Sequence, residues 1–231
     1  MNRPYIICHM VTSIDGKVTG DFLFQPECAG ATDIYYRLNR ELKADGFICG
    51  RVTMEGSFTG GWYPDLSQYE PVRHGIGLKM DCIVDDLNGF YAIAFDTHGK
   101  LGWKSNKIID PDGDPGYDGA QIIEVLSEDV DERYLGYLES MEIPYIFAGE
   151  KSIDVELALF KLKRTSSVAT PCFWKVVALS TAHLKERVRW MSSALSLLPR
   201  WQTRTANRCL WMRTLRILSW SKWKMKTGIL F

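Results

Sequence analysis

Short apolar runs and longer amphipathic stretches alternate along the first two thirds of the chain. Tyr5–Met10 (YIICHM) predicts a buried strand, because its β-branched residues lie between Pro4 and the polar Thr12. Phe47–Cys49 predicts a second buried strand, which runs into Gly50. The same pattern predicts strands at Met80–Val84, Tyr91–Phe95, Gln121–Leu126 and Tyr145–Ala148, and a weaker one at Lys107–Ile109.

Stretches with apolar residues at helical spacing separate several of these strands. Ala31–Lys43 predicts a helix that ends before Gly46, and Asp131–Met141 predicts another. Ser152–Lys163 predicts a third helix, with the Ser152 hydroxyl as its N-cap. Residues 56–76 are loop-like. Strands that alternate with helices of this length predict an α/β sheet with crossover connections.

The charge of the chain changes abruptly at about Lys163/Arg164. Residues 164–231 hold 13 of the 28 Lys and Arg residues but a single acid, Glu186, which leaves 15 basic and 27 acidic residues in 1–163. The last 68 residues also hold six of the eight Trp but one of the 19 Gly. The formal net charge of zero is therefore a cancellation between two unlike segments, and this break is typical of a misread frame.

The codons of Trp and Met test that interpretation, because each residue has a single codon. When the frame is shifted back by one base, Trp174-Lys175 must contain the Glu codon GAA, Trp190-Met191 the Asp codon GAT and Trp201-Gln202 the Ala codon GCA. From about Arg164 the degenerate codons permit KNFISCDTLLLEGGGTINGAFKREG, then VDEISLVIAP and VADQDSKPLFMDEDTEDFELVKVENED. This hidden text contains a Gly-rich turn and is acidic at its end. We therefore predict that one base is lost near Lys161–Lys163, and that 164–231 replace the last part of the domain formed by 1–163.

The remaining bulk features narrow the class of protein. No run has the length or form of a membrane span or a signal peptide. The six Cys show neither a CxxC pair nor a dense framework, which indicates a reducing cytoplasm. The four His and the Cys have no metal-ligand spacing, so we expect no metal site.

Three turns follow predicted strands: Thr12–Gly16, Gly50–Thr53 and Gly149–Ser152. In open α/β sheets, ligands bind at the edge where the carboxyl ends of the strands lie. Glycine allows close backbone approach and leaves amide N–H groups free for phosphate oxygens. Arg51 and Thr53 add a guanidinium and a hydroxyl, which are good phosphate partners. Each turn taken alone is also compatible with an ordinary strand-to-helix turn or an Asx turn.

Other polar residues have simpler interpretations. His9, between Cys8 and Met10, predicts a hydrogen-bonded core histidine. Trp62, in its Gly-rich loop, either covers a pocket or anchors the loop. The carboxylates of Asp85-Asp86 and of the cluster Asp110–Asp118 are expected to be solvated.

Together, Arg3–Gly20 (RPYIICHMVTSIDGKVTG) and Leu42–Thr53 (LKADGFICGRVT) resemble the reductase domain of bacterial riboflavin biosynthesis, in the dihydrofolate-reductase-like family. The resemblance covers about residues 3–163. The hidden frame supplies the family's next expected parts, with LLLEGGGTING at a Gly-rich cofactor turn and VDEISLVIAP at a late strand. The resemblance implies a mixed, mainly parallel sheet flanked by helices, and an NADPH-dependent reductase that opens the sugar of a phosphoribosylamino-pyrimidine by hydride transfer.

The resemblance also implies roles for single residues, and relatives of this fold are often homodimers. Asp15 is the candidate catalytic residue, which would orient the substrate. Ser13, Gly16 and Trp62 would contact the substrate, while Gly50, Arg51, Thr53, Gly149 and Glu150 would hold the cofactor.

The chain as written departs from this pattern where the late parts should follow. Val176, Val177 and Ala178 stand where the shifted frame can give three Gly, and the two Val side chains would crowd a backbone meant to approach a diphosphate. We expect a sheet without its late strands, weak NADPH binding, and activity that is doubtful enough to make an inactive remnant an alternative.

A second alternative takes the basic tail at face value. Its interleaved Trp and Lys/Arg residues could bind nucleic acid through base stacking and phosphate contacts. The partly amphipathic Leu210–Leu218 could instead lie on an anionic membrane. Either would make the protein a binding module.

Overall fold

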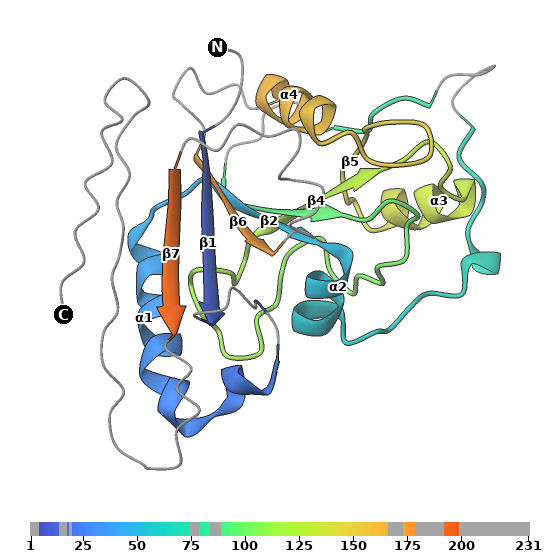
Figure 1. Cartoon of the computed structure of the whole chain (residues 1–231). Helices are drawn as coiled ribbons and strands as arrows, with labels where there is room; N and C mark the ends of the chain where they lie inside the picture. The colour runs from blue at the N-terminus through green and yellow to red at the C-terminus, as the bar shows by residue number, and fades with distance from the viewer. Residues whose placement is uncertain are drawn as a thin grey trace.

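The computed structural model describes residues 5–13, 18, 20–73, 79–83, 89–165, 173–178 and 192–198 (Figure 1). The strands in these ranges are β1 (Tyr5–Ser13), β2 (Gly46–Gly50), β3 (Tyr91–Phe95), β4 (Gln121–Leu126), β5 (Tyr145–Phe147), β6 (Phe173–Ala178) and β7 (Ser192–Leu198). The α-helices are α1 (Ala29–Glu41), α2 (Arg51–Met54), α3 (Glu132–Ser140) and α4 (Val155–Thr165). The 3-10 helices η1 (Asp21–Phe24), η2 (Pro26–Cys28) and η4 (Leu66–Gln68) and the π-helix η3 (Glu55–Thr59) are short.

The strands form one seven-stranded sheet in the order β5-β4-β3-β2-β6-β1-β7. Every ladder between these strands is parallel, and the antiparallel pairs in the described residues are two isolated bridges. The chain crosses from β1 to β2 by way of α1, and from β5 back to β6 by way of α4 (Figure 1). The expected α/β fold with a mainly parallel sheet is thus confirmed.

The strand predictions succeed where the sheet is buried on both faces. Tyr91–Phe95 and Gln121–Leu126 match β3 and β4 in both bounds. The strand predicted at Met80–Val84 is wrong, because its described part makes a single bridge, from Cys82 to Tyr145. The strand predicted at Lys107–Ile109 also reduces to one bridge, from Lys107 to Gln121.

All three predicted helices are present, and their ends differ from the predicted ones by one to three residues. α4 begins at Val155, and its N-terminal amides are capped by Asp154, whose Oδ1 accepts from the N–H groups of Glu156 and Leu157 at 2.9 and 3.2 Å. Ser152 is therefore not the N-cap, since a carboxylate nearer the first turn satisfies the free donors. The stretch 56–76, which was predicted to be loop, begins with helical residues, because α2 continues directly into η3. No helix in the described ranges is long and apolar enough to cross a membrane.

Two strands come from the segment 164–231. β6 lies between β1 and β2, and β7 pairs with the other side of β1 (Figure 1). The expectation that this segment would leave the sheet without late strands is therefore wrong. The basic stretch that could bind nucleic acid or a membrane lies at 199–231, outside the described residues.

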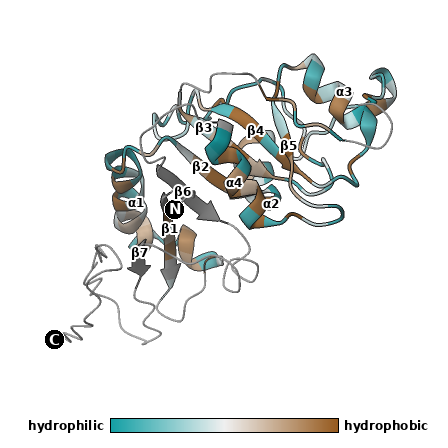
Figure 2. Ribbon diagram, turned by 90° about the horizontal axis from the view of Figure 1, so that it is seen from above, coloured by the Kyte–Doolittle hydropathy of each residue, from teal (hydrophilic) through white to brown (hydrophobic). Residues whose placement is uncertain are grey.

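Apolar residues predominate in the central strands β3 and β4 (Figure 2), and their side chains are buried on both faces of the sheet. On one face, Phe47 and Ala92 pack against α3 through Leu135 and Leu138, all of them buried. On the other face, residues of β2 to β5 pack against α4: Ile48, Ile93, Ile123 and Ile146 meet Ala158, Leu159 and Leu162. Parallel strands buried in this way have continuous apolar sequences, which explains why these strands could be predicted from the sequence.

Glu124 is an exception within this core. It lies on β4, is fully buried, and accepts a hydrogen bond from Trp103 Nε1 at its Oε1. The Tyr134 hydroxyl lies 3.3 Å from the same oxygen, while no residue of the described part hydrogen-bonds Oε2. Burial, followed by the nearby charge of Asp96, raises the pKa of Glu124 well above its ordinary value of 4.5. The folded protein therefore favours the protonated carboxyl.

This buried carboxyl predicts a dependence of stability on pH. Since the folded pKa is raised, Glu124 costs no stability below about pH 4.5, and its cost grows as pH rises from there toward the folded pKa. Glu124→Gln keeps the acceptor for Trp103, so it should be more stable than the unmodified chain at pH 8. The difference in unfolding free energy between Glu124→Gln and the unmodified chain should grow by at most about 1.4 kcal/mol for each unit of rising pH. Urea unfolding at pH 5 and pH 8 measures it, with the exposed Glu128→Gln as the control. An equal gap at both pH values would contradict the prediction.

The turn after β5 depends on Gly149. Its φ is 109°, and a Cβ placed there would lie 2.2 Å from the Ser152 carbonyl oxygen. The Gly149 carbonyl accepts from Glu128 N–H at 2.9 Å, which ties the turn to the end of β4. Glycine is required here by the turn itself, whatever the turn binds.

Gly149→Ala should therefore destabilise the fold, by about 1–3 kcal/mol for the backbone conformation alone. The clash with Ser152 adds to that cost. Gly113→Ala is the matched control, because Gly113 also has a positive φ, of 64°, but a Cβ there meets nothing within 4 Å. Urea midpoints of both variants check the prediction, and equal losses would show that the contact with Ser152 is unimportant.

Candidate functional site

The carboxyl ends of β1, β6 and β2 point toward the same edge of the sheet, and β1 extends further than the other two. In the parallel ladders, Val176 pairs with both Cys8 and Ile48, and Ala178 pairs with Cys49. Because neighbouring strands are about 4.8 Å apart, the β1 and β2 backbones are separated by about 10 Å at this register, with the β6 backbone between them. β1 continues from Cys8 to Ser13, while β2 continues only from Ile48 to Gly50, so Ser13 lies roughly 10 Å further along the strand direction than Gly50. This edge is where an open α/β sheet binds ligands.

The structure brings together part of the predicted site at this edge. Ser13 is the last residue of β1 and is buried. Gly50 ends β2 and precedes α2 with an extended backbone, at φ −78° and ψ 161°. Arg51 and Thr53 lie on α2 directly after it. Asp15 and Gly16, the candidate catalytic and substrate residues, lie outside the described residues.

Arg51 is not surrounded by neutral groups. Its guanidinium forms an ion pair with Glu55, one helical turn further along, and about a third of each side chain is exposed. Its positive charge also lowers the pKa of Asp96 at the end of β3, although burial, the larger effect, raises that pKa overall. The charge of Arg51 therefore acts on two carboxyl groups: Glu55, which begins η3, and Asp96, which follows β3.

Gly149 and Glu150 lie at the same edge but far from Ser13. β5 is three strands from β2 in the sheet order and five from β1. At about 4.8 Å per strand these separations are roughly 14 and 24 Å. A ligand held by both Gly50 and Gly149 would have to extend along the edge of the sheet, across the ends of β3 and β4.

Trp62 behaves as a loop anchor. Its backbone carbonyl lies so close to Gly102 that a Cβ there would be 2.0 Å from the oxygen, and Lys104 Nζ lies 5.6 Å from the centre of its ring. The indole is 41% exposed. These contacts hold the loop against the segment after β3, and the role of Trp62 toward a substrate stays a prediction.

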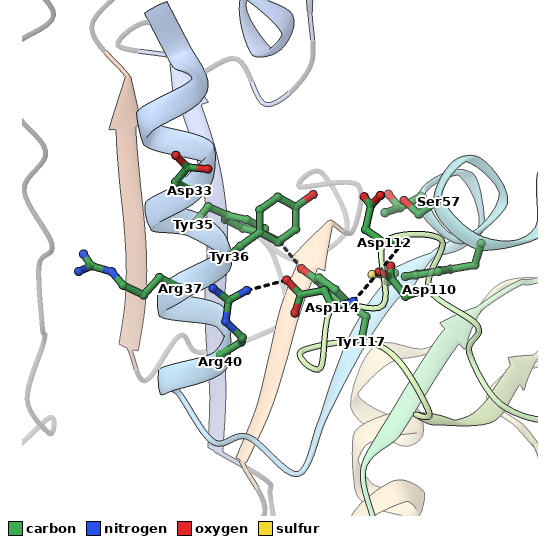
Figure 3. A pocket seen from close by; sticks show the side chains of 13 residues that line it. Asp33, Tyr35, Tyr36, Arg37, Arg40, Ser57, Asp110, Asp112, Asp114 and Tyr117 are labelled. Atoms are coloured by element: carbon green, nitrogen blue, oxygen red, sulfur yellow. Dashed lines mark hydrogen bonds and ion pairs between the residues drawn. The ribbon is translucent and has the colours of Figure 1, made fainter. Parts of the chain in front are cut away.

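A cavity of about 610 Å³ lies beside this edge, between α1, the helical run after β2 and the 110–117 loop (Figure 3). Of the described residues that the sequence pointed to, Thr53 lines it. At its wall the hydroxyls of Tyr35 and Tyr117 are 2.9 Å apart, and Arg40 Nη1 donates to Asp114 Oδ2 at 2.7 Å. The remaining lining residues are Asp33, Tyr36, Arg37, Cys49, Ser57, Phe58, Asp110 and Asp112.

The charge at this cavity differs from the expectation of freely solvated carboxylates. Asp114 is held by Arg40, and its Oδ1 accepts from Gly116 N–H at 2.7 Å. Burial raises the pKa of Tyr36, and the charges of Asp110, Asp114 and Asp112 raise it further. Tyr36 and the acidic loop are more than 70 residues apart in the chain, so local sequence gives no signal that they meet.

The predicted core role of His9 is confirmed. The ring is buried, its Nε2 lies 3.0 Å from the Tyr35 carbonyl oxygen, and it stacks on the Tyr35 ring at a centroid distance of 4.4 Å. In the described part of the chain, no group of three or more His, Cys, Asp or Glu side chains could hold a metal ion.

No protein-family model matches the chain, and no curated protein matches it by sequence. Among solved structures, it is similar to a riboflavin biosynthesis reductase of Saccharomyces cerevisiae, with a TM-score of 0.49 and 14% identity over 91% of this chain and 80% of that one. It is also similar to a diaminohydroxyphosphoribosylaminopyrimidine deaminase/5-amino-6-(5-phosphoribosylamino)uracil reductase of Thermotoga maritima, with a TM-score of 0.36 and 14% identity. That match covers 85% of this chain, which spans 44% of the length of the other.

Proposed function

We propose that the chain derives from an NADPH-dependent reductase of the riboflavin-biosynthesis type, acting on a phosphoribosylamino-pyrimidine. One observation supports this proposal above the others. The two sequence segments that carry the resemblance form β1 and β2, which flank β6 in the sheet, with Gly50–Thr53 at the carboxyl end of β2 and Ser13 further along at the carboxyl end of β1. Such an edge, with a glycine, a guanidinium and a hydroxyl in a row, suits a phosphate-bearing cofactor.

The residues at this edge fit the roles that binding requires. Gly50 leaves its backbone open to close approach, Arg51 supplies positive charge, and the Thr53 hydroxyl can donate or accept. When bound, the nicotinamide cofactor supplies the hydride. The protein then has to set distance, orientation and charge, which needs little acid–base chemistry. Ser13 ends β1, Asp15 comes two residues later in the sequence, and we assign substrate orientation to Asp15.

We also propose that residues 164–231 are read out of frame. The shifted frame places Glu at the Trp174–Lys175 junction and three Gly at Val176–Ala178. In the structure these three positions form the carboxyl end of β6, between β1 and β2. A Gly-rich backbone there would let a diphosphate approach the amide groups, whereas valine, with its branched side chain, is less suited to such an approach.

The proposal predicts how two forms of the chain bind NADPH. The chain as written should bind NADPH about 100-fold more weakly than a chain with the missing base restored, because about two charge-assisted hydrogen bonds to phosphate are lost. In the restored chain, Arg51→Ala should weaken binding about 10-fold, and Arg73→Ala, which is exposed and pairs with Glu132, should not. Isothermal titration measures the NADPH affinity of the chain as written, the restored chain and the two variants of the restored chain. The restored chain is then assayed for NADPH oxidation in the presence of the pyrimidine substrate.

Two results would contradict these proposals separately. Nanomolar binding of NADPH by the chain as written would contradict the prediction that the residues at 176–178 weaken cofactor binding. A restored chain that folds but binds no NADPH would remove the assignment as a reductase.

A further inference from the structure

The guanidinium of Arg51 already has a partner that a ligand phosphate would have to replace. Its Nη1 donates to Glu55 Oε2, and the two side chains are 35% and 36% exposed, so the pair is open to solvent and to ligands. If the only role of this arginine were to bind phosphate, its guanidinium would need no protein carboxylate as a partner. Here it is held by a carboxylate on the next turn of the same helix.

The two carboxyl groups near Arg51 differ in their freedom to move. Asp96 is buried, and its Oδ2 accepts from the N–H groups of Lys100 and Leu101, at 2.5 and 2.7 Å. It is therefore fixed as part of the turn after β3. Glu55 has no such bonds at its carboxylate among the described contacts except the one from Arg51.

The backbone around Glu55 leaves room for its side chain to swing. Glu55 begins the π-helix η3, which ends at Gly60 in the left-handed conformation, with Gly60 N–H donating to the Glu55 carbonyl at 2.8 Å. Next to it, Gly61 has no side chain, and a Cβ there would meet nothing nearer than Glu55 Oε1 at 4.0 Å. The Glu55 carboxylate thus lies beside Gly61, where no side chain stands next to it.

We infer that Glu55 is a specificity-determining residue, which competes with a ligand's phosphate monoester for the guanidinium of Arg51. This inference rests on the proposed function, since it takes Arg51 as the phosphate ligand. A phosphate must displace the Glu55 carboxylate and then lie near its negative charge. Glu55 therefore weakens phosphate-bearing ligands relative to phosphate-free ones and holds Arg51 in place while the site is empty.

The test measures binding of small phosphates to the full chain, with and without the Glu55 charge. Adenosine 2′-monophosphate and adenosine 5′-monophosphate present a monoester from the two ends of the nucleoside, and adenosine is the phosphate-free control. These ligands do not need the carboxyl end of β6 to be glycine. Ligand-observed NMR titration suits their weak affinities. The variants are Glu55→Gln, Glu55→Asp, Arg51→Gln and, as the matched control, Glu132→Gln, which removes a surface partner of Arg73 far from α2.

We expect Glu55→Gln to tighten binding of one of the two monophosphates about two- to five-fold, the range set by an exposed ion pair, and to leave adenosine unchanged. The gain should shrink at high salt, because exposed charges are screened. Glu55→Asp should stay near the unmodified chain, Arg51→Gln should lose the phosphate-dependent part of binding, and Glu132→Gln should change nothing. The monophosphate that responds identifies which phosphate Arg51 meets.

Failure of the inference and failure of the proposed function give different results. If a monophosphate binds through Arg51 but Glu55→Gln binds it no more tightly, the inference is overturned and the proposed function stands. If neither monophosphate binds any variant better than adenosine does, the assignment of Arg51 to phosphate is overturned, and the inference with it. Thermal unfolding of each variant shows whether a change reflects the site or the fold.

Discussion

The pairing of β6 with both β1 and β2 is the constraint on which the rest of the structure depends. Its parallel ladders join the strand that ends at Ser13 to the strand that ends at Gly50. Without β6, the facing N–H and C=O groups of β1 and β2 would lack partners, and two open edges would replace the middle of the sheet. The candidate site inherits this dependence, because β6 holds the strand that carries Ser13 and the strand that carries Gly50 in one sheet.

Much of the fold could be predicted from sequence, for a physical reason that also sets the limit. β3 and β4 are covered on both faces, so unbroken apolar runs such as Tyr91–Phe95 reveal them. A pattern of apolar residues does not show whether a run pairs with another strand along its whole length. For this reason the sequence predicts strands at Met80–Val84 and Lys107–Ile109, where the structure has isolated bridges. The N-cap at Asp154 was missed because Ser152 is as good a cap by residue type, and only the backbone path decides between them.

The site was less predictable than the fold, because charges and cavities are made by distant segments. Gly50–Thr53 was recognisable from residue type and its place after a strand. The ion pair between Arg51 and Glu55 follows from helical spacing, but only once α2 is known to continue into η3. The cavity wall, where Tyr35 meets Tyr117, joins residues 82 positions apart. The sequence pointed to Gly149 as a cofactor-binding glycine. Its positive φ and the nearby Ser152 carbonyl already require glycine at this position, without any ligand.

The central claim is that β6 ends in the wrong residues because the chain is read in the wrong frame from about Lys163 onward. The most direct measurement is to resequence the source DNA across codons 155–180. The account predicts one additional base near codons 161–163, so that the corrected text puts the Gly-rich turn at Val176–Ala178, between the ends of β1 and β2. An unchanged sequence would contradict it, and the chain as written would then be the natural product of its gene.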